Sequence, residues 1–470
     1  MKKILIAGAT GYVGSRLVPR LLEKGYRVRC LARNPDKLKN RSWNKVEIVQ
    51  GDVLDISSLE AALKNIDIAY YLVHAMGTLG DFRQKDSQSA RNFASAAKID
   101  GVKRIIYLGG LGDPEQNLSQ HLKSRQEVGQ ILGETGIPVT ELRASIIIGS
   151  GSASFEIIRD LVKKLPIMIT PRWVKSRCQP IAIDDILSYL IEVLRDQRTV
   201  GETFDIGGSE ILTYQTMMLQ VAEIMGKRLK IINVPVLTPH LSAYWLNLVT
   251  TVPMSVAFPL VEGLRNDTIC IDQRIQQFLP LQKTPFKDAV QTALQADKKS
   301  YLESRWTQAD TFNSDRMGRL NQRLLYDEQI VTCPASKDKV FAKIQKIGGN
   351  TGWYYANWTW KLRGLFDRLI GGVGMRRGRR HPTELRVGDT LDFWRVEKYI
   401  PGSYLKLRAE MKLPGIAWLE FDVNEEGGIT VLHQRAAFKP FNWFGYAYWF
   451  ILLPIHYFIF KNMAKNIALT

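Results

Sequence analysis

The chain has 470 residues, 45% hydrophobic and 23% charged, which is typical of a globular protein with two or three domains. Four widely separated cysteines and six histidines without HxxxH spacing exclude a disulfide scaffold and predict no metal site. The net charge of +18 is compatible with an anionic partner. No signal-peptide pattern precedes the first expected strand, so we expect a reducing, cytoplasmic compartment.

The first fourteen residues, MKKILIAGATGYVG, predict a nucleotide-binding turn. Residues 4–7 are an apolar run that suits a buried parallel strand. Gly8 permits a tight turn, Gly11 lets the backbone approach a phosphate, and Gly14 lets the following helix pack on the sheet. The free N–H groups at the start of that helix would hold a pyrophosphate. We therefore expect a dinucleotide-binding fold here, the alternative being an ordinary glycine-rich turn.

Strands and helices then alternate along the first third of the chain. Expected strands cover residues 27–32, 46–49, 69–73, 104–108 and 139–143, and expected helices cover residues 12–24, 86–100 and 120–135. This alternation predicts an α/β fold with a doubly wound parallel Rossmann sheet.

The pattern divides the chain into four parts. Residues 1–150 form the NAD(P)-binding Rossmann domain, and residues 151–297 a mixed substrate lobe of the same unit. Residues 298–330 are polar and poor in strands, so we expect a linker. Residues 331–470 form a separate α+β domain.

In this last part, hydrophobic residues alternate with polar ones over residues 405–411 and 417–423, which predicts antiparallel strands with one covered face. A third strand at residues 429–438 and a long apolar helix follow, so we expect a helix-grip fold that encloses a cavity. Its tryptophans either line an apolar ligand cavity or fill the core: Trp353, Trp358, Trp360, Trp394 and Trp418.

Two features of this part bear on a membrane. A cluster of arginines either contacts anionic lipid or lies in a solvated loop, and we expect no nucleic acid: Arg376, Arg377, Arg379, Arg380 and Arg386. Residues 441–460 are uncharged and about long enough to cross a bilayer. We favour a buried or amphipathic helix there and leave open a peripheral contact with an anionic inner membrane.

Several motifs resemble the atypical short-chain dehydrogenase/reductase family, of the extended, NmrA-like kind. They are GATGYVG at residues 8–14, Gly51-Asp52-Val53, Leu72-Val73-His74 and TELRA at residues 140–144. The chain is still more similar to a bacterial branch in which this fold is fused to a START-like, helix-grip domain of unknown function. Residues 119–128, 149–159, 171–186, 405–421 and 456–467 support this. The resemblance implies an NAD(P)-dependent oxidoreductase.

The resemblance also implies the residues that hold the cofactor. In the turn these are Gly8, Thr10, Gly11, Tyr12, Val13 and Gly14. Asp52 and Val53 would contact adenine, while Leu72, Val73 and His74 would line the adenosine and ribose side.

The choice of cofactor can be argued from Arg33. The second strand ends without the carboxylate that binds the ribose hydroxyls of NAD, and Arg33 follows it directly. A guanidinium pairs well with a 2′-phosphate, so NADP(H) is favoured over NAD(H). The alternative is a surface arginine that begins the next helix.

The catalytic residues usual in this superfamily are missing. No Ser or Thr follows the fifth strand, and the helix that should carry Tyr-xxx-Lys carries His121 and Arg125. His121 could donate a proton and Arg125 could hold a ribose or phosphate, or both could be ordinary polar residues. Arg143, Arg172 and Trp173 are candidate substrate contacts, with a salt bridge and a packed tryptophan as the alternative.

We favour an NADPH-dependent oxidoreductase or isomerase that acts on a hydrophobic small molecule. The missing Tyr, Ser and Lys favour the alternative, a catalytically inactive NADP(H)-binding redox sensor or scaffold at a membrane surface. The sequence does not predict an oligomeric state.

Overall fold

The computed structural model describes residues 2–39, 41, 43–74, 82–113, 115–234, 246, 249–250, 252, 254–298, 306 and 324–469. The chain forms two compact units, residues 1–311 and 312–470, and each contains its own hydrophobic core.

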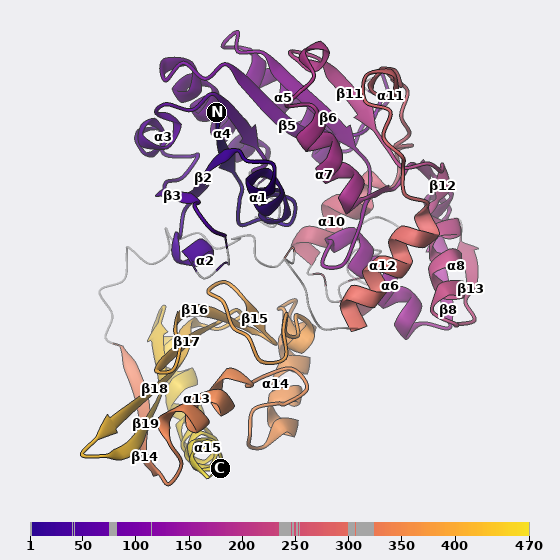
Figure 1. The fold of residues 1–470 in the computed structure, drawn as a ribbon. Coiled ribbons are helices and arrows are strands. Elements are labelled where there is room, and N and C mark those ends of the chain that lie inside the picture. The colour runs from indigo at the N-terminus through magenta and orange to yellow at the C-terminus, as the bar shows by residue number, and fades with distance from the viewer. Residues whose placement is uncertain are drawn as a thin grey trace. The chain divides into compact units, whose positions relative to one another are not determined.

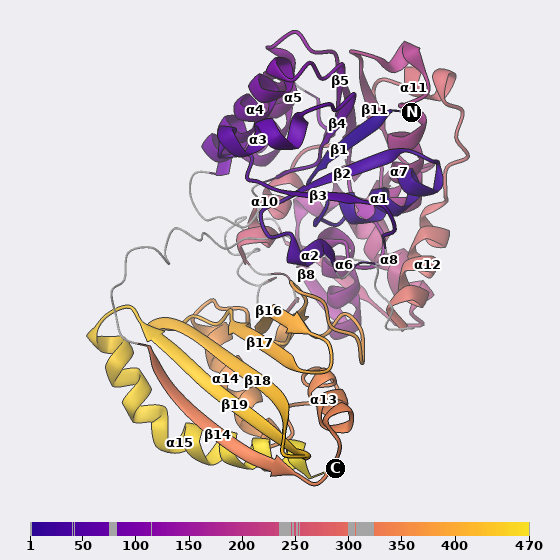
Figure 2. The same cartoon turned by 60° about the vertical axis from the view of Figure 1, so that its left-hand side comes forward.

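The first unit is built on a seven-stranded sheet in the order β11-β6-β5-β4-β1-β2-β3 (Figures 1 and 2). All its strand pairs are parallel, which confirms the predicted doubly wound sheet. The strands are β1 (Lys3–Ala7), β2 (Arg27–Ala32), β3 (Glu47–Gln50), β4 (Ile68–Tyr71), β5 (Arg104–Gly110), β6 (Val139–Ala144) and β11 (Thr203–Ile206).

Helices cover both faces of this sheet because successive strand residues point to opposite sides. Ile4 and Ile6 share a core with α1 (Gly14–Glu23) and α7 (Ile183–Glu192). Leu5 and Ala7 share another with the helices on the opposite face. These are α3 (Ile56–Leu63), α4 (Phe82–Ile99) and α5 (Gln120–Gly133), and the short α2 (Asp36–Lys39) follows β2.

The rest of the first unit, which includes the expected substrate lobe, contains both helices and short strands. Its helices are α6 (Ala153–Lys164), α8 (Tyr214–Ile224), α10 (Met254–Gly263), α11 (Arg274–Phe278) and α12 (Phe286–Lys298). Its strands pair two by two: β7 (Ile147–Ile148) with β10 (Ile181–Ala182), β8 (Ile167–Pro171) with β13 (Lys230–Val234), and β9 (Arg177–Cys178) with β12 (Leu212–Thr213).

The second unit has a six-stranded antiparallel sheet in the order β14-β19-β18-β17-β16-β15 (Figure 2). The strands are β14 (Leu325–Cys333), β15 (Thr390–Leu391), β16 (Trp394–Ile400), β17 (Tyr404–Ala409), β18 (Gly415–Glu426) and β19 (Ile429–Pro440). Gly427 and Gly428 both have positive φ, of 59° and 81°, and this turn joins β18 to β19. The helices are α13 (Lys337–Gln345), α14 (Asn357–Leu369) and α15 (Trp443–Ala468), and α15 packs against β14 and β19.

The predicted C-terminal bound of the linker, residue 330, is wrong. Strand β14 begins at Leu325, inside the stretch 298–330, and pairs with β19 along its length. It is an edge strand rich in polar residues, so its sequence lacks a strand pattern. Trp306 is tied to the first unit, since its backbone N–H donates to the Gly151 carbonyl oxygen at 2.9 Å. The rest of residues 299–323 lies outside the described part of the chain.

The aromatic side chains of the second unit mostly fill its core. Trp353, Trp360, Phe393 and Trp394 are buried and their rings contact one another at centroid distances of 5.1–6.1 Å. Trp358 is exposed, and the half-buried Trp418 donates its indole N–H to Glu397 at 2.8 Å. Three of the five tryptophans therefore agree with the core-filling alternative.

The arginine cluster turns inward. Arg377 and Arg380 are buried in ion pairs with Glu410 and Asp389, and Arg379 donates to the Ile347 carbonyl oxygen at 2.7 Å. These three arginines form neither a solvated loop nor a contact surface. The half-buried Arg386 lies 3.7 Å from Glu384, and the Arg376 side chain lies outside the described part.

Candidate functional site

The glycine-rich turn folds as a nucleotide-binding loop requires. Gly8 has a φ of 99°, and a Cβ there would lie 2.6 Å from the Leu72 carbonyl oxygen. A Cβ on Gly14 would collide with the Gly8 carbonyl oxygen, so α1 packs closely only without a side chain there. The Gly11 N–H donates to that oxygen at 3.0 Å. The turn thus directs the amino end of α1 to the carboxyl edge of the sheet, the usual place for a pyrophosphate.

The Tyr12 side chain serves a structural purpose. The Arg16 guanidinium lies 4.2 Å from its ring centroid, and Gly149 leaves room for its hydroxyl. Arg16 also donates to the Ser150 carbonyl oxygen at 2.9 Å, and burial raises the Tyr12 pKa. Tyr12 and Arg16 therefore join the turn to the loop at Gly149 and Ser150.

The predicted adenosine residues meet at one edge, because they follow the adjacent strands β4, β1, β2 and β3. Arg33 is exposed directly after β2. The Asp52 carboxylate accepts the Leu54 N–H at 3.0 Å, which orders the loop after β3. Leu72 donates its N–H to the Ala7 carbonyl oxygen at 2.9 Å, and Val53 is buried.

His74 and His121 lie together beside this edge. Their ring centroids are 5.0 Å apart, although the two residues come from the end of β4 and the first turn of α5. The His74 Nδ1 atom lies 3.0 Å from the buried Asp86 carboxylate on α4, which also accepts the Ser124 hydroxyl at 3.3 Å. Within the described residues, His74 Nε2 and His121 Nδ1 are buried without a hydrogen-bond partner.

Burial governs the charge of both rings. It lowers the pKa of His121 well below its usual value, and the neighbouring His74 and Arg125 lower it further. Burial and Arg125 also lower the pKa of His74, and the Asp86 carboxylate opposes this shift. Both imidazoles are therefore neutral at neutral pH.

Arg125 lies one helical turn after His121. Its Nη2 atom donates to the Leu108 carbonyl oxygen at 2.8 Å, and its own carbonyl oxygen accepts the Tyr107 hydroxyl at 2.9 Å. These bonds hold Arg125 against the end of β5, close to His121.

A buried carboxylate leaves no room for a side chain at Gly109, near the end of β5. Glu141 on β6 is buried, and its carboxylate lies between Gly109 and Gly129. A Cβ on Gly109 would lie 2.5 Å from Glu141 Oε1, and a Cβ on Gly129 would lie 2.6 Å from Oε2. Burial raises the Glu141 pKa. Arg143 donates to both Glu141 oxygens, at 3.1 and 3.2 Å.

This ion pair places Arg143 outside the cavity lining, so the predicted substrate contact is not brought to the site and the salt-bridge alternative agrees with the structure. Arg172 and Trp173 lie in a short 3-10 helix (Arg172–Lys175), and their side chains lie outside the described part.

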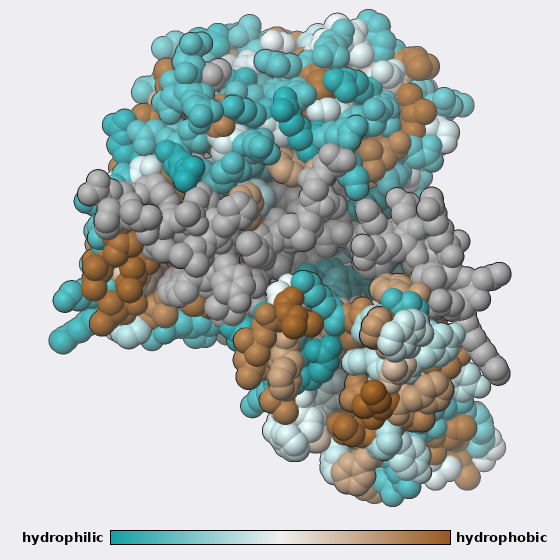
Figure 3. Space-filling view, turned by 180° about the vertical axis from the view of Figure 1, so that it is seen from behind, coloured by the Kyte–Doolittle hydropathy of each residue, from teal (hydrophilic) through white to brown (hydrophobic). Residues whose placement is uncertain are grey.

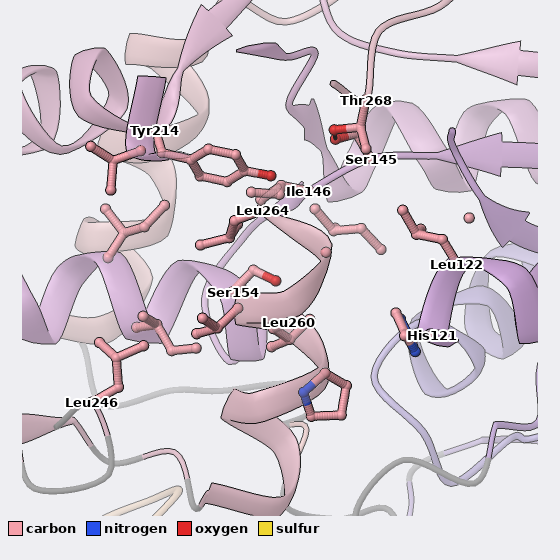
Figure 4. Close-up of a pocket in the computed structure, with 18 of the residues that line it drawn as sticks. His121, Leu122, Ser145, Ile146, Ser154, Tyr214, Leu246, Leu260, Leu264 and Thr268 are labelled. Atoms are coloured by element: carbon pink, nitrogen blue, oxygen red, sulfur yellow. Dashed lines mark hydrogen bonds between the residues drawn. The ribbon is translucent and has the colours of Figure 1, made fainter. Parts of the chain in front are cut away.

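A cavity of about 690 Å³ extends from the two histidines and Arg125 into the substrate lobe. The side chains that line the cavity are predominantly aliphatic, for example Leu122, Ile157, Leu161, Met218 and Leu264. In Figure 4 the labelled side chains surround a central space, with His121 on one side and Tyr214 on the other. Such a cavity suits an apolar molecule of moderate size.

A group of hydroxyls supplies polarity to this cavity. The Ser145 and Thr268 side-chain oxygens are 2.6 Å apart, and the Tyr214 hydroxyl bonds to the Thr268 side chain (Figure 4). Burial raises the pKa of Tyr214, which therefore stays protonated. These three residues and Asp86 were not predicted from the sequence, because they come from four separate segments with no shared motif.

Comparison with known proteins agrees with this geometry. A family model described as NAD(P)H-binding matches residues 8–154, and one described as a protein of unknown function (DUF2867) matches residues 319–463. A (4-alkanoyl-5-oxo-2,5-dihydrofuran-3-yl)methyl phosphate reductase from Streptomyces griseus is 26% identical, over 48% of this chain and 75% of that protein. The chain carries an NAD(P)-dependent oxidoreductase domain.

Two further matches agree with this oxidoreductase domain. A ceramide reductase from Caulobacter vibrioides is 26% identical, over 49% of this chain and 73% of that protein. The crystal structure of Citrobacter sp. triphenylmethane reductase with NADP(H) has a TM-score of 0.51 and 19% identity, covers 62% of this chain and 99% of that one, and shows the shared fold. Matches to some other reductases span less than two thirds of those proteins. The inactive-sensor alternative is not favoured, because the matched relatives are enzymes.

Proposed function

We propose that this protein is an NADPH-dependent reductase of a carbonyl group in an apolar small molecule. The observation that carries the proposal is the aliphatic cavity, which begins at His121 and Arg125 beside the predicted cofactor edge. The alkanoyl chain and the ceramide named in the two relatives' substrates are apolar too.

The residues present fit the cofactor, because Gly8 and Gly14 let the tight turn pack directly against the end of β4 and the start of α1, where a Cβ would strike backbone. The turn would hold the diphosphate, Arg33 the 2′-phosphate, and Arg125 the nicotinamide ribose. A bound reduced nicotinamide supplies a hydride to the substrate carbon.

His121 would replace the usual tyrosine. A neutral imidazole would donate its single N–H to the carbonyl oxygen and polarise it. The alkoxide formed on reduction would take that proton, and water would reprotonate the imidazolate left behind. Asp86 accepts from His74 Nδ1 and so leaves His74 Nε2 as an acceptor next to His121. The single N–H of a neutral His121 cannot serve both His74 and the substrate, so His74 would position His121 through the contact of the two rings. An arginine side chain does not transfer protons near neutral pH, so Arg125 would bind the cofactor and would not act as an acid or base.

The test follows NADPH oxidation by the full chain with aldehydes and ketones of increasing alkyl length. We expect kcat/KM to rise with chain length, and His121→Phe to lower it by about 100-fold or more while NADPH affinity stays within about twofold. His433→Phe, far along the sequence in the second unit, is the matched control. Tight NADPH binding without turnover of any apolar carbonyl would refute the proposed activity.

A further inference from the structure

Two helices of the second unit expose large apolar side chains along one stripe each. On α14 the stripe follows a helical spacing and consists of Trp358, Leu362, Leu365, Phe366 and Leu369. On α15 it occupies the first four turns and consists of Trp443, Phe444, Phe450, Ile451, Ile455 and Phe458. Trp358 and Ile451 are 68% and 73% exposed. Apolar side chains accordingly gather on the surface of this unit (Figure 3).

The two stripes belong to neighbouring helices. The Tyr355 ring, just before α14, lies 5.7 Å from the Phe458 ring on α15, and the Trp360 and Phe460 rings are 6.1 Å apart. Together the stripes form what we call the α14/α15 face. Soluble proteins rarely expose this many large apolar side chains on two adjoining helices without a partner.

The accessible charges on these two helices are all positive. Every exposed or half-buried charged side chain of α14 and α15 is cationic: Lys361, Arg363, Arg368, Lys461 and Lys465. The single carboxylate, Asp367, is fully buried and accepts the backbone N–H groups of Gly374 and Lys412, each at 2.8 Å. Apolar and aromatic groups combined with cations match the interface of an anionic bilayer.

Helix α15 is long and apolar enough to cross a membrane by composition, but its second half packs in the core. Ile459, Met463, Ala464 and Ile467 are buried with the sheet residues. The exposed part, residues 443–458, is roughly 24 Å long as a helix, shorter than the roughly 30 Å hydrocarbon layer. This geometry favours a helix that lies in the interface.

We propose that the α14/α15 face docks this protein onto the surface of an anionic lipid bilayer. Docking would bring it to the place where apolar molecules accumulate, and only this consequence rests on the proposed function. The choice of a bilayer follows from the cationic charge and the aromatic residues.

The test is flotation of the full chain with vesicles of phosphatidylcholine alone or of equal parts phosphatidylcholine and phosphatidylglycerol. We expect binding to the anionic vesicles, weakened by salt, and at least about tenfold weaker partition for the double variant F366Q/I451Q. The control is I99Q/I271Q, which removes side chains that are 75% and 66% exposed in the first unit. Absence of flotation, or equal flotation of F366Q/I451Q and the wild type, would overturn the proposal.

Two further measurements distinguish a bilayer from a second copy of the chain as the partner of this face. Brominated lipid in the anionic vesicles should quench tryptophan fluorescence, and W358F/W443F should remove most of that quenching without changing the fold. If the wild type sediments as a dimer that F366Q/I451Q dissociates, and neither floats, a second copy covers the face and the bilayer proposal fails. NADPH oxidation without vesicles tests the proposed function separately.

Discussion

At the scale of single residues, the glycines of the first turn tolerate the least change. Gly14→Ala places a Cβ against the Gly8 carbonyl oxygen, so α1 must move away from the turn that would hold the diphosphate. We expect at least about tenfold weaker NADPH binding in a fluorescence titration. Gly133→Ala is the control, because its nearest neighbour would be 4.0 Å away. Wild-type affinity in Gly14→Ala would remove the turn from the cofactor site.

Arg33 can be tested by charge reversal. A guanidinium paired with a 2′-phosphate contributes about 1.5–3 kcal/mol, so Arg33→Asp should weaken NADP⁺ binding by about 10- to 100-fold and leave NAD⁺ binding nearly unchanged. Arg27→Asp, at the other end of β2, controls for the change in net charge. Calorimetric titration with both coenzymes gives the ratio, and an unaltered ratio would contradict the assignment.

Sequence reasoning could propose only those candidate site residues that belong to one motif. The glycine turn and the pair of His121 and Arg125 are read from fixed spacing on adjacent elements. Asp86, Tyr214 and Thr268 could not be found in this way, because α4, α8 and the loop after α10 converge only in the folded lobe. Of the two roles left open for Arg143, the structure agrees with the salt bridge, since its partner Glu141 lies two residues away on the same face of β6.

At the scale of elements, strongly periodic segments were predicted well and short or polar ones were not. The strand expected at residues 27–32 has those bounds, because both its faces are buried and its sequence is largely apolar. Strand β11 was missed, and β14 was missed because its edge position tolerates charge. Helix α15 was predicted, but only the structure shows that its two halves differ in exposure.

His456 on the same helix should make the stability of the protein depend on pH. Burial, assisted by Arg363, lowers the pKa of His456 to about 4, whereas the unfolded chain binds this proton near pH 6.5. The unfolded state therefore holds more protons in this window, so the unfolding free energy falls as pH falls from 6.5 to 4, by about 3 kcal/mol in total.

The contribution of His456 can be isolated with His456→Phe, which keeps an aromatic ring between Trp449 and Phe460. Urea unfolding at pH 7.5 and pH 4 should show a smaller loss of stability in the variant, by about 3 kcal/mol. Equal losses in both proteins would mean that His456 does not stay neutral when folded.

At the scale of the whole molecule, the predicted cofactor residues and the cavity all lie before residue 270, in a unit with its own core. We therefore expect a chain ending at Lys298 to bind NADPH within about twofold of the full-length affinity. The full chain should show two calorimetric unfolding transitions, and NADPH should raise only one of them. A single transition, or loss of NADPH binding on truncation, would show that the units depend on each other.

The wedge formed by Glu141 between Gly109 and Gly129 has an evolutionary consequence. A lineage that gained a side chain at position 109 would first have to shorten or lose the carboxylate at 141, and that loss would deprive Arg143 of its ion-pair partner. The order of substitutions is thus constrained, and we expect non-additive effects on stability among positions 109, 129, 141 and 143.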